Sequence, residues 1–336
     1  MKICLVTRYF DFRNAGIGRF SMEMKKGLEG RGHEVFALST DKTSLLSYFN
    51  YTFFELQLRL PKGFDVYHAL TPMEAMWMPK SKSVVTILDL IPITNPERAG
   101  AGIGYNILKR FVGSQYFQLA CNVAMRCKKI ICISKQTKDD VLRKFKVGEG
   151  KVEVIKLGIS ADLEATGKQD DVFRIGYLGQ LDRRKRVNLL IKAVKESSVN
   201  CELVIGGTGV DEERLKKLAE SDRRIKFLGL VSDDKLVDFY NSLSIFVIPT
   251  WVEGYGLPIV EAMACEKPVV VLKDAIIPEE VKSRCIRTNV LNTESLIYLS
   301  EHIDHSLLNS NSRWAKEHSW SRCMDEYIRV YEEVRG

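Results

Sequence analysis

Two glutamates eight positions apart flank a glycine-rich turn in the second half of this 336-residue chain. Glu253 precedes the turn and Glu261 follows it, inside the segment FVIPTWVEGYGLPIVEAMACEKPVVV (residues 246–271). The apolar start of the segment predicts a strand, and the pattern after the turn predicts a helix. Backbone N–H groups at a helix start bind anions, so those of Gly256 and Leu257 could hold a diphosphate.

Both glutamates also allow a plainer interpretation. Glu253 could complement the positive end of the helix dipole, and Glu261 could be a solvated helix residue. An acidic residue within the apolar stripe of residues 259–263 argues against the second interpretation. On the predicted helix, Glu261 would lie about 7.5 Å of axial rise beyond Gly256, whereas Glu253 would remain in the loop, where it can reach ligand hydroxyls.

A second pair of glycines opens a helical pattern near the N-terminus. Gly16 and Gly18 follow a predicted strand over residues 3–7, in the stretch RYFDFRNAGIGRFSMEM. Glycine at a strand-to-helix turn lets an anion approach the backbone N–H groups. Turns of this kind also occur for tight packing alone, so this loop by itself leaves both interpretations open.

The elements that would position these residues are strands that alternate with helical patterns. The first half of the chain contains six β-branched or apolar runs, at residues 3–7, 34–39, 65–68, 84–88, 130–133 and 152–155. The second half contains five, at residues 174–178, 202–205, 225–228, 245–248 and 268–272. This alternation predicts parallel sheets covered by helices on both faces.

A polar stretch over residues 160–171 lacks any apolar period and predicts the link between two domains. We therefore predict an α/β protein of two doubly wound, Rossmann-like domains that face each other across a cleft. The first would cover residues 1–165 and the second residues 170–318. Ligands of such domains bind beyond the carboxyl ends of the strands, so the loops after strands should carry the chemistry.

The charge distribution indicates an anionic partner for the first domain. Residues 1–160 carry a net charge of +11 and the remainder −4, which gives +7 in total. A basic surface attracts phosphate-bearing ligands, lipid headgroups or nucleic acid, and a merely solvated basic face is the alternative. The sequence has no nucleic-acid-binding motif, so we expect no nucleic-acid partner.

Cysteine usage and hydropathy bear on the metal and on the compartment. The eight cysteines are scattered, without a C-x-x-C pair or a cluster at zinc spacing. No apolar run approaches the ~18 residues of a membrane span. We expect a cytoplasmic protein, with peripheral contact to the inner face of the membrane as an option.

At this point a family resemblance becomes specific. EGYGLPIVEAMA is similar to the Glu-x7-Glu signature of retaining glycosyltransferases with the GT-B fold, of the family 4 type (glycosyl transferases group 1). IGYLGQLDRRKRVNLLIKAV resembles that family's GRLxxxKG diphosphate motif, and HSWSRCMDEYIRVYEEV its final helix. Further segments match in the expected order: AGIGRF, GRGHEV, CISKQTKDDV, VIKLGIS, VIGGTG and KFLGLVSDDKLVDFYNSLSIFVIPT. The resemblance therefore covers nearly the whole chain, and it implies that a helix at about residues 320–336 packs back on the first domain.

The resemblance also implies roles for single residues. Glu261 would hold the ribose hydroxyls of a nucleotide-sugar donor, and Glu253 the hydroxyls of the transferred sugar. Lys185 would bind the diphosphate, and Val231 would meet the base through its backbone. We assign Lys185 and Glu253 as catalytic residues. The predicted donor-binding residues are Gly16, Arg184, Val231, Gly256, Leu257 and Glu261, and the glycines of VIGGTG would close around the nucleotide from beneath.

Metal dependence can be judged separately. Cation-dependent sugar transferases usually display two aspartates at i and i+2, and this sequence has no such pair. The basic run at residues 183–186 would instead stabilise the leaving diphosphate, unless it is a solvated basic turn. We expect no metal and no cofactor besides the donor substrate.

The sequence departs from the family pattern at several positions, and two of them bear on the donor site. Gln180 stands where the GRL motif has arginine, and it cannot offer a charged fork to the diphosphate. Arg183 or Arg184 could compensate. Leu88 replaces the histidine of the family's TIHDL segment, which contacts the transferred sugar in relatives. These departures concern the donor sugar and the rate, and they leave the predicted fold unchanged.

The predicted activity is metal-independent transfer of a hexose, mannose or glucose, from a UDP- or GDP-sugar to a saccharide or lipid-linked acceptor. The resemblance implies retention, with the acceptor hydroxyl attacking on the leaving-group face and a diphosphate oxygen taking its proton. A catalytically weak sugar-nucleotide-binding subunit is the rival of a different class, and an epimerase or a phosphorylase the rival among enzymes. The aromatic segment at residues 45–60 could rest on a membrane or hold a lipid-linked acceptor, and an ordinary core helix is the alternative.

Overall fold

The structure is a computed structural model that describes residues 1–11, 15–40, 45–98, 107–167 and 172–336. The described chain divides into two compact units. Among the described residues, unit 1 contains those of 1–96, 107–158 and 320–336, and unit 2 contains residues 97–98 and those of 159–319. Residues 159–165, which the sequence analysis placed in the first domain, belong to unit 2, and part of the predicted linker, residues 168–171, lies outside the described residues.

Unit 1 is built on a parallel sheet of six strands in the order β2-β1-β3-β4-β5-β6. Its strands are β1 (Lys2–Val6), β2 (Glu34–Leu38), β3 (Val66–Ala69), β4 (Ser83–Ile87), β5 (Lys129–Cys132) and β6 (Val152–Val154). Its α-helices are α1 (Ala15–Glu29), α2 (Leu45–Asn50), α3 (Leu56–Arg59), α4 (Ile91–Thr94), α5 (Ile107–Ala124), α6 (Lys135–Lys144) and α14 (Trp320–Arg335). Short π- and 3₁₀-helical turns complete it at Tyr51–Glu55, Pro72–Ala75, Lys80–Lys82 and Glu149–Lys151.

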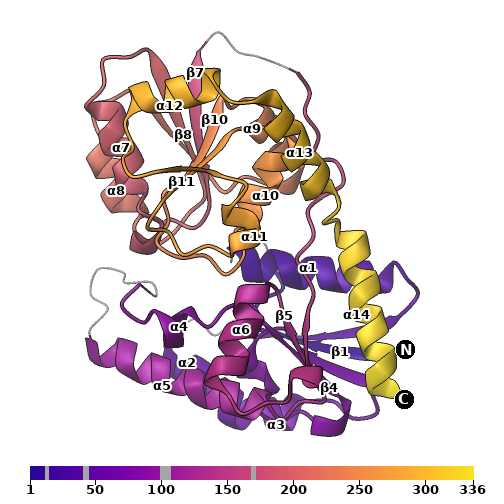
Figure 1. The fold of residues 1–336 in the computed structure, drawn as a ribbon. Helices are drawn as coiled ribbons and strands as arrows, with labels where there is room; N and C mark the ends of the chain where they lie inside the picture. Colours follow the sequence, from indigo (N-terminus) through magenta and orange to yellow (C-terminus); the bar gives the residue numbers. More distant parts are fainter. Residues whose placement is uncertain (12–14, 41–44, 99–106, 168–171) are drawn as a thin grey trace. The chain divides into compact units, whose positions relative to one another are not determined.

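Side chains alternate along each strand, so each residue of this sheet can be assigned to one of its two faces. Cys4 and Val6 of β1 lie in one buried cluster with Cys121 of α5 and Val141 of α6, because successive strand residues point to opposite faces. The opposite face is covered by α1 and α14, which pack together (Figure 1). Phe20 of α1 and residues of α14 are completely or almost completely buried there.

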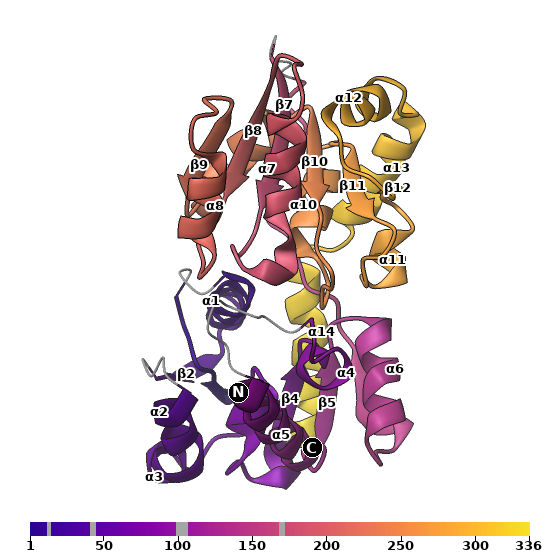
Figure 2. The same cartoon turned by 90° about the vertical axis from the view of Figure 1, so that its left-hand side faces the viewer.

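Unit 2 repeats the plan with a parallel sheet in the order β12-β11-β10-β7-β8-β9 (Figure 2). Its strands are β7 (Phe173–Leu178), β8 (Cys201–Gly206), β9 (Ile225–Gly229), β10 (Ile245–Ile248), β11 (Val269–Leu272) and β12 (Ile286–Thr288). Its α-helices are α7 (Val187–Lys195), α8 (Glu212–Ala219), α9 (Asp233–Asn241), α10 (Leu257–Ala264), α11 (Glu279–Lys282), α12 (Thr293–Glu301) and α13 (His305–Lys316), and η6 (Arg183–Lys185) is a single 3₁₀ turn.

The predicted α/β class with two doubly wound sheets is confirmed. All eleven predicted strands are present, and each end lies within one residue of its predicted position. The sequence analysis missed β12, because IRT is only three residues long and has a single apolar side chain. Such a short edge strand gives no periodic signal, and only its register against Val270–Leu272 of β11 defines it.

The aromatic segment at residues 45–60 is helical and divides its side chains between core and solvent. Tyr51 and Leu56 are completely buried, whereas Phe54 is 64% and Leu58 87% exposed. Part of the segment therefore packs as a core helix does, and part presents apolar side chains to the solvent. The side chain of Tyr48, which belongs to this segment, is not among those that the structure describes. Among the residues that the structure describes, no helix is long and apolar enough to cross a bilayer.

Candidate active site

The strand order of unit 2 brings two loops together at the carboxyl edge of its sheet. The chain runs outwards from β7 to β8 and β9, then returns to place β10 on the other side of β7. Ile175 of β7 pairs with Ile245 of β10, so the loops that follow these strands start next to each other. A switch point of this kind is where doubly wound sheets bind ligands.

The loop after β7 is ordered by a capping aspartate. Asp182 is buried, and its carboxylate accepts a hydrogen bond from the backbone N–H of Lys185 at 3.2 Å. This bond caps the single turn η6, as aspartate commonly does at a helix start. The turn sets the Lys185 side chain towards the loop that follows β10.

Lys185 and Glu253 form a buried ion pair between these two loops. Lys185 Nζ donates to Glu253 Oε1 at 2.5 Å, and the two residues are 9% and 8% exposed. Burial raises the pKa of Glu253, but the positive charges of Lys185 and Arg184 outweigh that effect, and the pKa lies below its ordinary value. Burial lowers the pKa of Lys185, and the Glu253 carboxylate opposes this only in part. The lowered pKa keeps Glu253 ionised at neutral pH, and its carboxylate accepts the hydrogen bond from Lys185 Nζ.

The two predicted catalytic residues thus lie in contact, and Arg184 lies beside them. Arg184 Nη1 donates to the carbonyl oxygen of Val252 at 3.0 Å, and its own carbonyl accepts from the N–H of Trp251 at 2.9 Å. These bonds join the two loops along their length. Arg183, by contrast, is exposed to solvent.

The helix that follows the second loop begins at a glycine, as the sequence analysis predicted. Gly256 caps α10 with φ at +91°, a conformation that residues with a side chain rarely adopt. The first N–H groups of a helix have no partner within it, so those near Gly256 and Leu257 mark the positive end of α10. An anion at the switch point would meet this end directly.

Glu261 is almost completely inaccessible within α10. It is 1% exposed, and its Oε2 accepts a hydrogen bond from the Tyr240 hydroxyl of α9 at 2.7 Å. The solvated-residue interpretation of Glu261 is therefore wrong, because the carboxylate is buried and bonded. Tyr240 itself is completely buried.

A glycine loop after β8 supports the first loop from the neighbouring strand. Gly207 has φ at +115°, and a Cβ there would lie 1.9 Å from the carbonyl oxygen of Gly179. Only glycine therefore allows the two loops to approach this closely. Val231, which follows β9, packs beside this loop, since its Cγ2 would lie 2.9 Å from a Cβ at Gly206.

Gly16 lies in unit 1, in the first turn of α1. It is exposed, and no heavy atom of the described residues lies within 4 Å of the place that a Cβ would take. Packing against the described part of the chain therefore does not require glycine at this position. The other predicted site residues, from Arg184 to Glu261, all belong to unit 2.

Sequence reasoning missed three polar residues that organise the site. Tyr240 gave no signal, because a tyrosine in an amphipathic helix is typical of a core. Asp182 follows a strand and precedes a helix, so its capping role could have been predicted from the sequence, but it was not. The third is Arg186, which the sequence analysis counted among cations available to a diphosphate, and all three of its guanidinium nitrogens instead donate to protein oxygens.

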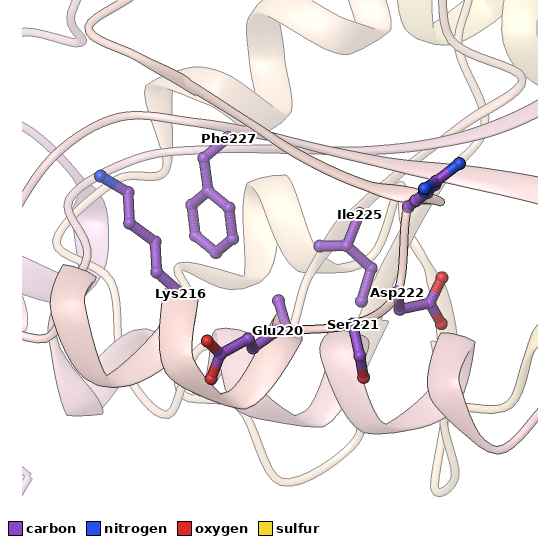
Figure 3. Close-up of a pocket in the computed structure, with 8 residues that line it drawn as sticks. Lys216, Glu220, Ser221, Asp222, Ile225 and Phe227 are labelled. Atoms are coloured by element: carbon purple, nitrogen blue, oxygen red, sulfur yellow. The ribbon is translucent and has the colours of Figure 1, made fainter.

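A cavity of about 480 Å³ lies elsewhere on unit 2 (Figure 3). Ile225 and Phe227 of β9 line it, together with Lys216 and Glu220 from the end of α8. Ile225 is the first residue of β9, so the cavity begins at the amino ends of the strands. It is therefore remote from the loops that carry Lys185 and Glu253.

Comparison with known proteins places this architecture. Residues 159–318 match the family model described as Glycosyl transferases group 1. O-antigen chain mannosyltransferase B of Escherichia coli is 25% identical, over 98% of this chain and 99% of the relative. The crystal structure of Anabaena HepE in complex with UDP and glucose superposes with a TM-score of 0.72 at 16% identity, over 99% of this chain and 100% of that one. Sucrose-phosphate synthase of Thermosynechococcus elongatus gives 0.73 at 15% identity, over 99% of both chains.

The solved structures define the fold as GT-B, the class of glycosyltransferase with two Rossmann-like domains. The family model and the mannosyltransferase relative indicate the activity in addition to the fold. The chain is a glycosyltransferase, and residues 159–318 of its unit 2 match the glycosyl transferases group 1 family.

Proposed function

We propose that unit 2 binds a UDP- or GDP-hexose and that the chain transfers the hexose, mannose or glucose, with retention and without a metal. The observation that carries this proposal is the buried Lys185–Glu253 pair at the switch point, directly before the start of α10. The pair offers a cation for a diphosphate and a carboxylate for sugar hydroxyls within one hydrogen bond of each other. The name of the relative that spans the chain, a mannosyltransferase, supports a hexose as the transferred group.

In this mechanism the protein stabilises the leaving group. As the bond between the anomeric carbon and the diphosphate breaks, negative charge grows on the diphosphate oxygens. Lys185, Arg184 and the first N–H groups of α10 would stabilise that charge most in the transition state. A diphosphate oxygen would take the proton of the acceptor hydroxyl on the same face of the sugar. Glu253 would hold the sugar hydroxyls, and Glu261 the ribose of the nucleotide.

The acceptor in this proposal is a saccharide or a lipid-linked saccharide bound by unit 1. Two observations support a lipid-linked form. Unit 1 contains the chain's excess positive charge, and it also exposes the apolar side chains of Phe54 and Leu58. Together these features suit an amphiphilic, anionic acceptor at a membrane surface.

A thermal-shift panel tests the donor site. UDP, GDP, ADP and their common sugar conjugates are added to the wild-type chain and to Glu261→Ala, each with and without EDTA. Ligand at about 100 times its Kd adds ~2.7 kcal/mol of stability. We expect one nucleotide family to raise the Tm of the wild-type chain and to have no effect on the variant.

The same panel separates the rival interpretations. Stabilisation that EDTA abolishes would contradict the metal-free site. The absence of any shift would contradict the donor site and favour a phosphorylase. Stabilisation by a sugar nucleotide that is never turned over would favour a catalytically weak binding subunit, a rival that Gln180 and Leu88 keep open.

A further inference from the structure

Arg186 occupies a backbone conformation that favours glycine. Its φ is +53° and its ψ +31°, in the left-handed region, where it ends η6 and precedes α7. The GRLxxxKG motif, which this segment resembles, has glycine at this position. A residue with a Cβ is strained there, so the surrounding contacts must hold it in place.

The side chain of Arg186 supplies those contacts. It is 9% exposed. Nε donates to the carbonyl oxygen of Pro249 at 2.5 Å, and Nη2 to that of Thr250 at 2.8 Å. Nη1 and Nη2 also bind the two carboxylate oxygens of Asp274, at 2.7 and 2.8 Å. Such a bidentate pair fixes the orientation of the planar guanidinium as well as its position.

These bonds connect three loops at the carboxyl edge of the sheet. Arg186 follows β7, Thr250 follows β10 and Asp274 follows β11. The joined segments carry the proposed donor-binding groups, because Lys185 directly precedes Arg186 and Glu253 lies three residues after Thr250. Arg186 therefore follows Lys185 in the chain, and its guanidinium bonds to the loop that carries Glu253.

We propose that Arg186 is a positioning residue of the donor site, holding the loop of Lys185 against the loop of Glu253 so that diphosphate and hexose are bound in one geometry. The inference rests on the proposed function. Arg186 does not itself meet the donor, since each of its guanidinium nitrogens already binds the protein. Its effect reaches the donor through Lys185 and Glu253.

Two variants and one control test this role. Arg186→Gly can adopt the left-handed backbone conformation at this position, and it removes every hydrogen bond of the Arg186 side chain. Asp274→Ala removes only the carboxylate, whose side chain is 56% exposed, so the fold should tolerate the change. Lys273→Ala alters the exposed neighbour of Asp274 and serves as the control. Binding is measured by calorimetry with UDP-glucose and GDP-mannose, and with UMP and GMP as ligands that lack the β-phosphate and the hexose.

The positioning role predicts a selective loss. A displacement of about 1 Å in a reacting geometry can cost on the order of a hundredfold. We therefore expect Arg186→Gly to weaken binding of the sugar nucleotide by about tenfold or more, and Asp274→Ala to weaken it less. Affinity for the matching monophosphate should be unchanged in both variants, and Lys273→Ala should equal the wild type.

Two results would overturn the inference alone. One is an unchanged affinity for the sugar nucleotide in both Arg186→Gly and Asp274→Ala. The other is an equal loss for the monophosphate, which would assign Arg186 to general folding of unit 2. Should Arg186→Gly fail to fold, Asp274→Ala decides by the same comparison. A wild-type chain that binds neither UDP-glucose nor GDP-mannose would instead overturn the proposed function, and this inference with it.

Discussion

Lys185 and Glu253 are charged, nearly inaccessible, and partners of each other. Burying two charges is costly, and the cost is offset only while both partners remain ionised and bonded. In an enzyme that binds an anionic diphosphate, the ion pair would hold the cation and the carboxylate in their binding positions already in the absence of the ligand. The residues thus combine a structural and a proposed catalytic role.

The sequence identified both members of the pair but not their contact. Glu253 was found from its spacing to Glu261, and Lys185 from a motif. Their ion pair depends on β7 and β10 being neighbours, although 68 positions separate the residues. No local pattern encodes that adjacency. The role of Arg186 was hidden for the same reason, since its acceptors lie on two other loops.

The ion pair predicts how stability depends on pH at this site. The pKa of Glu253 is lowered in the folded chain, so its stabilising contribution is complete above the ordinary carboxyl pKa and is lost as the pH falls through the lowered value. We expect Glu253→Gln to cost about 3 kcal/mol at pH 7, because it leaves Lys185 buried without its counter-charge. Urea unfolding at pH 7 and pH 4 should show that the difference from the wild type shrinks at pH 4.

A double variant provides the control for this prediction. Lys185→Met together with Glu253→Gln removes both charges, and it should recover most of the stability that the single variant loses at pH 7. A single variant as stable as the wild type at pH 7 would contradict the ion pair.

At the scale of elements, α14 is bonded to the sheet of unit 1 by buried polar groups. His68 of β3 pairs through Nδ1 with the Tyr331 hydroxyl at 2.6 Å and through Nε2 with Thr86 of β4 at 2.8 Å. Thr86 is also 3.0 Å from the Tyr327 hydroxyl. These contacts join the last helix of the chain to strands some 240 to 260 residues earlier. The resemblance implied a helix that returns to the first domain, but the bonds could not be inferred without the fold.

This network predicts an acid-sensitive helix. Burial lowers the pKa of His68 to about 3, whereas an unfolded histidine has a pKa of about 6.5. Between these values the unfolded form binds the additional proton, so stability falls by about 1.4 kcal/mol for each pH unit below about 6.5. We expect amide hydrogen exchange in α14, corrected for its intrinsic pH dependence, to show roughly thirtyfold less protection at pH 5 than at pH 7.

Two histidine variants test the assignment. His68→Gln should remove most of the pH dependence of α14 protection, because the amide does not titrate. His302→Gln changes an exposed histidine of unit 2 and should leave the dependence intact. The same loss of protection in wild type and His68→Gln would contradict the assignment to His68.

At the scale of the whole molecule, the sequence predicted the fold class because strand and helix patterns alternate without interruption. Strand order was not legible, and it is the order β10-β7-β8 that makes a site out of two distant loops. The charge asymmetry between the two halves was also visible in the sequence. Glu261, Lys185 and Arg186 bond to residues on other elements. The spacing of residues along the sequence could not predict these contacts.

The central claim is that this chain cleaves a nucleoside diphosphate hexose by means of the groups around Lys185 and Glu253. It is tested most directly by the release of UDP or GDP from UDP-glucose, UDP-galactose, GDP-mannose and GDP-glucose, measured by chromatography with and without EDTA. We predict slow release from one donor family by the wild-type chain, and a rate at least about a hundredfold lower in Glu253→Gln. Release that stops with EDTA, or that is unchanged in Glu253→Gln, would contradict the account.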